Sequence, residues 1–348
     1  MRYPEFLKDN GTIGFIAPAF GCAIEPYRSR FENALNIFKN KGYQIYLGPN
    51  CYENSGIGIS NKPSLCGAEL NAAMTDDVSD VIITCGGGEL MVEVDPYIDF
   101  EKIKLCKPKW YMGYSDNTNF TFLSNILADT ASIYGPCAPS FGRQPWHSSI
   151  DDAFKLLRGE KLSVRGYEKW ELYEESEDDE EEIDPLAPYY LTEPADYKYY
   201  NANAGENKVE MEGRLIGGCV DILTLLTGTR FDKVEEFLEK YKEDGFIWFL
   251  ECCDLDMLSI RRAFWQMREA GWFKYVKGFL IGRPRIYGED VMGVDQYNAV
   301  TDIIGGFNVP IIMDLDIGHL PPSIPIISGS IGKVMADGND FRLDYILE

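Results

Sequence analysis

The sequence is poor in histidine and in basic residues. Two histidines, His147 and His319, occur in 348 residues, so a reaction that needs an imidazole base has two candidates. Lys and Arg number 33 against 56 Asp and Glu, which gives a formal net charge of −23. A chain this acidic repels phosphate backbones, so we expect no nucleic acid partner.

Long hydrophobic runs and paired cysteines are also missing. No stretch reaches the ~20 apolar residues that span a bilayer, and residues 1–10 lack the apolar core of a signal peptide. We therefore expect a cytoplasmic protein with no membrane partner. The 9 cysteines include no C-x-x-C pair, which predicts reduced, mostly buried thiols rather than disulfides or a zinc site.

Acidic residues are concentrated in one segment. Between Glu171 and Asp184, ten of the fourteen residues are Asp or Glu, and without them the net charge would be −13. A run of this kind is typical of a solvated loop or insertion. The extreme charge is therefore largely local.

The first 150 residues alternate short apolar runs with amphipathic segments. The pattern predicts strands over residues 12–17, 43–47, 81–84 and 110–113, and helices over residues 27–41, 63–74 and 120–127. On the first helix, Phe31, Ala34, Leu35 and Phe38 share one face. This alternation indicates an α/β fold with a parallel sheet covered by helices on both faces.

The rest of the chain divides in two. Residues 161–212 lose the periodic pattern and are rich in tyrosine, acid and proline, so we expect a linker or insertion after an N-terminal domain at residues 1–160. Residues 213–348 are expected to form a strand-rich second domain. Its expected strands are residues 214–217, 246–250, 278–281 and 310–313, with further short strands after Pro325, and its clearest helix is 254–270.

The two histidines have different contexts. His147 lies in a polar turn, which is typical of a surface residue. His319 follows an apolar strand pattern and sits in a Gly-His-Leu-Pro corner, the kind of strand-end loop where a scaffold places catalytic side chains. On its own, His319 fits a structural histidine and a base equally well.

Ser115 stands between a short strand and a helix, two residues after Gly113. This is the context of a nucleophile elbow, although Asn117 replaces the second glycine of G-x-S-x-G. A helix cap formed by Ser115 and Asp116 is an alternative interpretation.

Two further segments end apolar strands on reactive groups. Cys85 precedes Gly86, Gly87 and Gly88 and is a rival nucleophile. These glycines lack a phosphate-binding motif, and we expect them to let backbone N–H groups approach a substrate. Glu251 ends the apolar stretch 246–250, where an acid that orients an imidazole would sit. Its alternative is an ion pair with Arg261 or Arg262.

In chain order, these segments resemble the LD-carboxypeptidase family of serine peptidases, peptidase family S66, and within it the branch of microcin C self-immunity peptidases. The resemblance runs through most of the chain. It is carried by residues 14–19, 85–87, 112–118, 213–219, 249–251, 282–284 and 318–319.

The resemblance implies a Rossmann-like N-terminal domain, a β-barrel-like C-terminal domain, no metal or organic cofactor, and usually a homodimer. It also implies a Ser-Glu-His triad of Ser115, Glu251 and His319. The branch often carries an aromatic that stacks on a nucleobase just before residue 213; residues 203–206 have none, and Trp170 or Tyr199 could take its place.

The expected reaction is hydrolysis of a peptide or amide bond through an acyl-enzyme. The N–H of Asp116 and one from the Gly86-Gly87 turn are the expected oxyanion donors, and Arg283 is a candidate ligand for a substrate carboxylate. The expected substrate is a muropeptide or a peptidyl or aminoacyl nucleotide. The alternative is a non-catalytic or nucleotide-binding α/β module.

Overall fold

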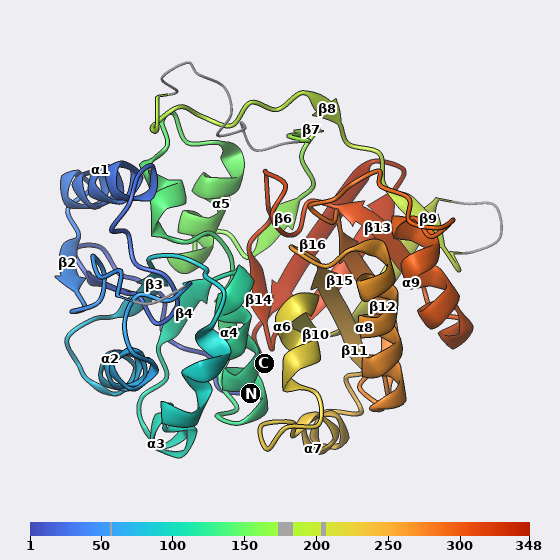
Figure 1. Ribbon diagram of the computed structural model, residues 1–348, viewed down its shortest axis with the longest axis horizontal. Helices are drawn as coiled ribbons and strands as arrows, with labels where there is room; N and C mark the ends of the chain where they lie inside the picture. Colours follow the sequence, from blue (N-terminus) through green and yellow to red (C-terminus); the bar gives the residue numbers. More distant parts are fainter. Residues whose placement is uncertain (56–57, 173–183, 203–206) are drawn as a thin grey trace. The chain divides into compact units, whose positions relative to one another are not determined.

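The computed structural model of the protein (Figure 1) describes residues 1–55, 58–172, 184–202 and 207–348. These residues form two compact units. The first unit takes in residues 1–161, 184–189 and 325–328, and the second takes in the described residues of 162–172, 190–324 and 329–348. Most of the acidic run therefore lies outside the described residues.

A six-stranded sheet forms the centre of the first unit in the described part of the chain. Its order is β14-β5-β4-β3-β1-β2; neighbours from β5 to β2 are parallel and β14 is antiparallel to β5. In doubly wound sheets of order 2-1-3-4-5, ligands bind beyond the carboxyl ends of the strands next to the point where the order reverses. The strands are β1 (Thr12–Ile16), β2 (Gln44–Leu47), β3 (Val81–Thr84), β4 (Trp110–Gly113), β5 (Ser132–Tyr134) and β14 (Ile326–Ser328).

Helices cover both faces of this sheet, which confirms the predicted architecture. Helix α1 buries Phe31, Ala34, Leu35 and Phe38, the face expected from their spacing. In Figure 1, α1 and α5 lie on one side of the sheet and α2 and α3 on the other. The helices are α1 (Tyr27–Asn40), α2 (Pro63–Thr75), α3 (Phe100–Leu105), α4 (Thr118–Ile126) and α5 (Ser148–Leu157), with 3₁₀ turns η1 (Met91–Glu93), η2 (Asp95–Tyr97), η3 (Ser115–Asn117) and η4 (Ala138–Gly142).

The second unit is strand-rich, as predicted. Its described residues form an eight-stranded sheet of order β6-β16-β15-β10-β11-β12-β13-β9, in which β10 to β13 are parallel and the outer pairs are antiparallel. The strands are β6 (Ser163–Arg165), β9 (Lys198–Tyr200), β10 (Lys208–Cys219), β11 (Phe246–Glu251), β12 (Val276–Gly282), β13 (Ile311–Leu315), β15 (Ile331–Asp337) and β16 (Asp340–Ile346), beside a small pair β7 (Lys169–Trp170) and β8 (Glu193–Pro194).

Four helices and a 3₁₀ turn complete the described part of this unit. They are α6 (Val220–Leu226), α7 (Val234–Lys240), α8 (Met257–Glu269), α9 (Gln296–Ile304) and η5 (Gly305–Phe307). Helix α8 begins three residues after the predicted start at residue 254, because the side chain of Asp256 accepts the N–H of Ser259 at 2.7 Å and caps the helix.

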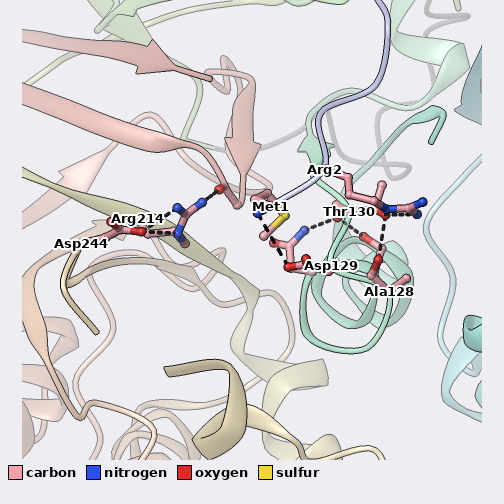
Figure 2. A network of polar contacts seen from close by, with 10 residues as sticks. Met1, Arg2, Ala128, Asp129, Thr130, Arg214 and Asp244 are labelled. Carbon is pink, nitrogen blue, oxygen red and sulfur yellow. Dashed lines mark hydrogen bonds and ion pairs between the residues drawn. The ribbon is translucent and has the colours of Figure 1, made fainter. Parts of the chain in front are cut away.

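A buried arginine anchors strand β10. The Nε and Nη2 atoms of Arg214 donate to Asp244 at 2.9 and 2.6 Å, and Nη1 donates to the carbonyl of Gly329 (Figure 2). These bonds compensate the cost of burying the charge. They fix β10 to the turn before β11, and the register of the two strands then pairs Cys219 with Glu251 at their carboxyl ends.

In the first unit, the amino-terminal segment is held by Arg2. Its guanidinium donates to the Thr130 hydroxyl at 2.6 Å (Figure 2) and to the carbonyls of Cys106 and Ile103 at 2.8 and 3.1 Å. A single side chain thus ties the start of the chain to α3 and to the residues before β5.

Several features are not anticipated by the sequence pattern. The described residues of 161–212 contain β6 to β9 and the start of β10. The short strand expected after Pro325 is present as β14, but it joins the sheet of the first unit and not that of the second. Strands of two or three residues are too short to show a period. The 9 cysteines are all free and 7 are buried, as predicted, and no described helix has the length and apolar character needed to cross a membrane.

Candidate active site

Ser115 occupies a strained turn between β4 and α4. It opens the turn η3 with φ of +62°, a left-handed conformation that a non-glycine residue adopts only when its surroundings enforce it. No side chain caps this turn or α4, so the helix-cap interpretation is wrong. The geometry is that of a strand-to-helix turn that presents a serine hydroxyl.

Gly87 lies directly against this serine. A Cβ added at Gly87 would come 3.0 Å from both Cβ and Oγ of Ser115, so a larger residue would require the serine to shift by a few tenths of an ångström. The N–H of Ser115 donates to the hydroxyl of Tyr134 at 3.2 Å, a contact that sequence reasoning missed because Tyr134 belongs to a different strand. Within the described residues, the N–H groups of Gly87 and Asp116 have no hydrogen-bond acceptor.

Two buried carboxyl groups lie behind the turn. Asp116 is 1% exposed and accepts the N–H of Met91 at 2.7 Å, while burial raises its pKa to about 7. Asp95 is also buried, and neither of its oxygens has a partner among the described residues. Burial, reinforced by the nearby charge of Asp116, raises the pKa of Asp95 well above its ordinary value. Sequence reasoning did not single out Asp95.

The rival nucleophile, Cys85, has the wrong environment for a thiolate. It is fully buried, and burial together with the neighbouring thiols of Cys22 and Cys51 raises its pKa well above the ordinary value. Since the thiolate is the reactive form, this position favours an inert structural cysteine.

Glu251 and His319 form a hydrogen-bonded pair in the second unit. His319 Nδ1 lies 2.8 Å from Glu251 Oε2, and the side chains are 14% and 0% exposed, respectively. Burial disfavours the imidazolium, but the Glu251 carboxylate and the hydrogen bonds to Cys253 and Glu251 outweigh it and raise the pKa of His319 well above its ordinary value. A bond at Nδ1 leaves Nε2 as the basic nitrogen.

Local backbone features make this pair possible. Glu251 is the last residue of β11, and a Cβ at Gly318, whose φ is +111°, would lie 2.6 Å from Glu251 Oε2. Asp221, at the start of α6, accepts the N–H groups of Cys253 and Asp254 at 3.1 and 2.8 Å and so fixes the loop after β11. Sequence reasoning missed Asp221 and Cys253.

Arg261, one of the two arginines considered as partners of Glu251, pairs with a different carboxylate. Arg261 donates to Asp302 at 2.7 Å and to the carbonyl of Asn298 at 3.0 Å. The partner of Glu251 is His319, so the interpretation of Glu251 as half of an ion pair with Arg261 is wrong.

Arg283 is held in a buried ion pair. It is 1% exposed, its Nη2 donates to Asp316 at 2.8 Å, and its guanidinium carbon lies 4.6 Å from the centre of the Trp170 ring. The other oxygen of Asp316 accepts the Tyr197 hydroxyl at 2.7 Å. Within the described residues, Nη1 of Arg283 is buried and has no hydrogen-bond partner.

The remaining candidates have structural contacts. His147 caps α5 by accepting the N–H of Ser149 at 3.1 Å. The Tyr199 hydroxyl donates to the carbonyl of Gly338 at 2.5 Å, and residues 203–206 lie outside the described residues. No cluster of three or more His, Cys, Asp or Glu side chains suited to a metal occurs in the part of the chain that is described.

Two family models and several named proteins resemble this chain. The LD-carboxypeptidase N-terminal domain matches residues 13–135, and the LD-carboxypeptidase C-terminal domain matches residues 212–334. A Vibrio cholerae protein named as a carboxypeptidase is 27% identical over 99% of this chain and 98% of its own length. The Escherichia coli microcin C7 self-immunity protein MccF is 26% identical over 91% and 88%, and a Bacillus subtilis protein named as a murein peptide carboxypeptidase is 25% identical over 94% and 89%.

Solved structures show the same fold. The structure of MccF in complex with glutamyl sulfamoyl guanosine superposes with a TM-score of 0.79 at 22% identity, and the match covers 99% of this chain and 98% of that one. The two family domains, the length-wide sequence likeness and the shared fold together show that the chain belongs to the LD-carboxypeptidase family, peptidase family S66, whose members are serine-type peptidases.

Proposed function

We propose that the protein hydrolyses a peptide or amide bond through a triad of Ser115, Glu251 and His319. Ser115 Oγ attacks the substrate carbonyl while His319 Nε2 takes the hydroxyl proton. Glu251 holds the proton on Nδ1 and stabilises the imidazolium that forms. Family membership favours this reaction over a non-catalytic α/β module.

The tetrahedral intermediate needs donors for its oxyanion. The N–H groups of Gly87 and Asp116 are proposed for this role, and their lack of acceptors in the described residues supports it. Collapse of the intermediate breaks the C–N bond, and the leaving amine takes the proton from His319. Water then attacks the acyl-enzyme by the same route and releases the acid.

The observation that carries the proposal is the 2.8 Å bond between His319 and Glu251. The Glu251 side chain is fully buried, so its carboxylate does not contact solvent. Its hydrogen bond to the partly exposed imidazole of His319 produces an oriented base. The strained turn at Ser115 supplies a matching nucleophile by independent geometry.

The proposed substrate is a peptidyl or aminoacyl nucleotide cleaved at its amide. Solved structures of MccF hold glutamyl sulfamoyl guanosine and aspartyl sulfamoyl adenosine, and the likeness to MccF covers 91% of this chain. The second candidate is a muropeptide that loses its terminal amino acid, favoured by the likeness to the protein named as a murein peptide carboxypeptidase. In either case, Arg283 Nη1 is a candidate donor to a substrate carboxylate.

Mass spectrometry of parallel reactions tests both the triad and the substrate. The purified protein is incubated with aspartyl sulfamoyl adenosine and with a tetrapeptide muropeptide, beside the Ser115→Ala variant. We expect release of aspartate from the nucleotide by the wild type and none by the variant. Release from the muropeptide alone would assign the second substrate, and equal release by the Ser115→Ala variant would contradict the mechanism.

A further inference from the structure

Asn117 connects the turn that carries Ser115 to the glycine-rich turn after β3. Its Nδ2 donates to the carbonyl of Gly86 at 2.7 Å and to the carbonyl of Tyr114 at 3.2 Å. Its Oδ1 accepts the Tyr111 hydroxyl at 2.6 Å. Since carbonyls only accept hydrogen bonds, these partners allow one orientation of the amide.

Tyr111 is a dependable donor in this arrangement. It is fully buried in β4, and burial, with nearby acidic groups including the Cys137 thiol, raises the pKa of its hydroxyl well above the ordinary value. Tyr111 therefore keeps its proton over the working range of pH. The chain Tyr111, Asn117, Gly86 is a directed series of hydrogen bonds that ends on one backbone carbonyl.

That carbonyl determines where the next N–H points. Gly86 C=O and Gly87 N–H belong to one peptide unit, which is trans because the cis bonds of the described chain all precede proline. In a trans peptide these two groups point in opposite directions. Asn117 is fully buried and holds the Gly86 carbonyl inward, so the Gly87 N–H points outward. Gly87 is also the residue that lies against Ser115 Oγ.

The other end of the glycine-rich segment is also held from the serine turn. Asp116 Oδ2 accepts the N–H of Met91 at 2.7 Å, and the side chain of Asn119 donates to the carbonyl of Asp116 at 2.9 Å. Hydrogen bonds from the side chains of residues 116 and 117 therefore hold the segment 86–91 at both ends. A shift of this segment relative to Ser115 would have to break both contacts.

We propose that Asn117 is a positioning residue that orients the Gly86-Gly87 peptide so that the Gly87 N–H stabilises the oxyanion formed at Ser115. The proposal rests on the proposed function and adds a reason for asparagine at this position. An elbow with glycine here would lack the amide that holds the Gly86 carbonyl.

The test compares two buried asparagines of similar bonding. Asn117→Asp keeps the shape but puts a carboxylate oxygen against the Gly86 carbonyl, so the peptide is expected to turn. Asn125, in α4, also donates to a carbonyl, Thr130 at 2.8 Å, and accepts a hydroxyl, Ser328 at 2.6 Å, but it touches neither turn. Asn125→Asp is the matched control.

We expect Asn117→Asp to lower kcat by about 10²-fold with KM changed less than about threefold, as for loss of an oxyanion donor. Phosphonylation of Ser115 by a fluorophosphonate should slow in parallel. Asn125→Asp should lose comparable thermal stability but keep kcat within about threefold. Tyr111→Phe, which removes one oxygen, should lower kcat by about tenfold and keeps the proposal testable should Asn117→Asp not fold.

The outcomes separate this proposal from the triad. An inactive Ser115→Ala variant beside a folded Asn117→Asp variant with near wild-type kcat would overturn the role of Asn117 alone. Equal losses of kcat in Asn117→Asp and Asn125→Asp would also overturn it, because both would then reflect general destabilisation. An active Ser115→Ala variant would instead overturn the proposed function.

Discussion

The turn around Ser115 and the loop around His319 are stabilised by different physical means. The groups directly against Ser115 are uncharged: its own backbone at positive φ, a glycine against its hydroxyl and a tyrosine hydroxyl on its N–H, whereas the Asp116 carboxyl group binds the Met91 N–H. Around His319 the central contact is between an imidazole and a buried carboxylate. One region depends on shape and the other on charge.

The difference predicts which kind of substitution will impair each region. Substitutions that change volume should disrupt the serine turn at any pH, because sterics do not titrate. Changes of charge should act on the histidine pair and appear in the pH profile, because Glu251 raises the pKa of His319.

Removal of the serine hydroxyl should have the largest effect. We expect Ser115→Ala to lower kcat by roughly 10⁴-fold or more, since loss of a nucleophile leaves only binding and oxyanion stabilisation. Cys85→Ala is the control and should keep kcat within about threefold, because its thiol is buried and protonated. Steady-state kinetics with the proposed substrate measures both; a larger loss of kcat in Cys85→Ala than in Ser115→Ala would assign the nucleophile to Cys85.

Glu251→Gln tests the charged region. It should lower kcat by roughly 10³-fold, because the amide no longer fixes the histidine tautomer. The base works as neutral imidazole, so activity rises as pH passes the pKa of His319; without the carboxylate that pKa falls, and the rising limb should move to lower pH. A limb that stays in place in the profile of kcat/KM against pH would show that Glu251 does not control His319.

Gly87→Ala tests the neutral region. The added Cβ would lie 3.0 Å from Ser115 Oγ, and a displacement of a few tenths of an ångström should lower kcat by about tenfold at every pH. Gly306→Ala is the matched control, since nothing lies within 4 Å of a Cβ there. A pH-dependent loss in Gly87→Ala would contradict the steric explanation.

The smallest effect concerns stability. Because the pKa of Asp95 is raised by burial, the folded protein binds more protons than the unfolded chain above about pH 4, so stability falls as pH rises from there toward the folded pKa. Asp95→Asn removes this penalty and should raise the melting temperature at pH 8 by about 2–4 °C, with a smaller gain at pH 5. Scanning calorimetry measures both melting temperatures. Asp77 is exposed, so Asp77→Asn should not give a larger gain in melting temperature at pH 8 than at pH 5.

The same contrast explains what could be predicted from the sequence. Strands β3 and β4 agree with the predicted bounds to the residue because they are buried on both faces and are nearly continuous apolar runs. The turn at Ser115 follows from that local pattern. Helix α4 starts two residues earlier than its apolar pattern, because Thr118 and Asn119 are buried polar residues.

The histidine pair could not be read in this way. Glu251 and His319 are 68 residues apart, and their pairing depends on Gly318 and on the loop held by Asp221. No periodicity relates such segments. The local sequence pattern indicates Glu251 and His319 as separate candidates, and their pairing is predicted from the family resemblance. The burial of Arg283 beside Trp170 and Asp316 likewise comes from three separate segments and has no local signature.

Labelling with a fluorophosphonate tests the central claim most directly, because the reagent reacts much faster with a serine that a base has activated than with an ordinary hydroxyl. Intact-protein and peptide mass spectrometry should find one phosphonyl group on Ser115 of the wild type, and a rate at least about 10²-fold lower in His319→Ala. Equal labelling of Ser115 in His319→Ala, or modification at another residue, would contradict the account.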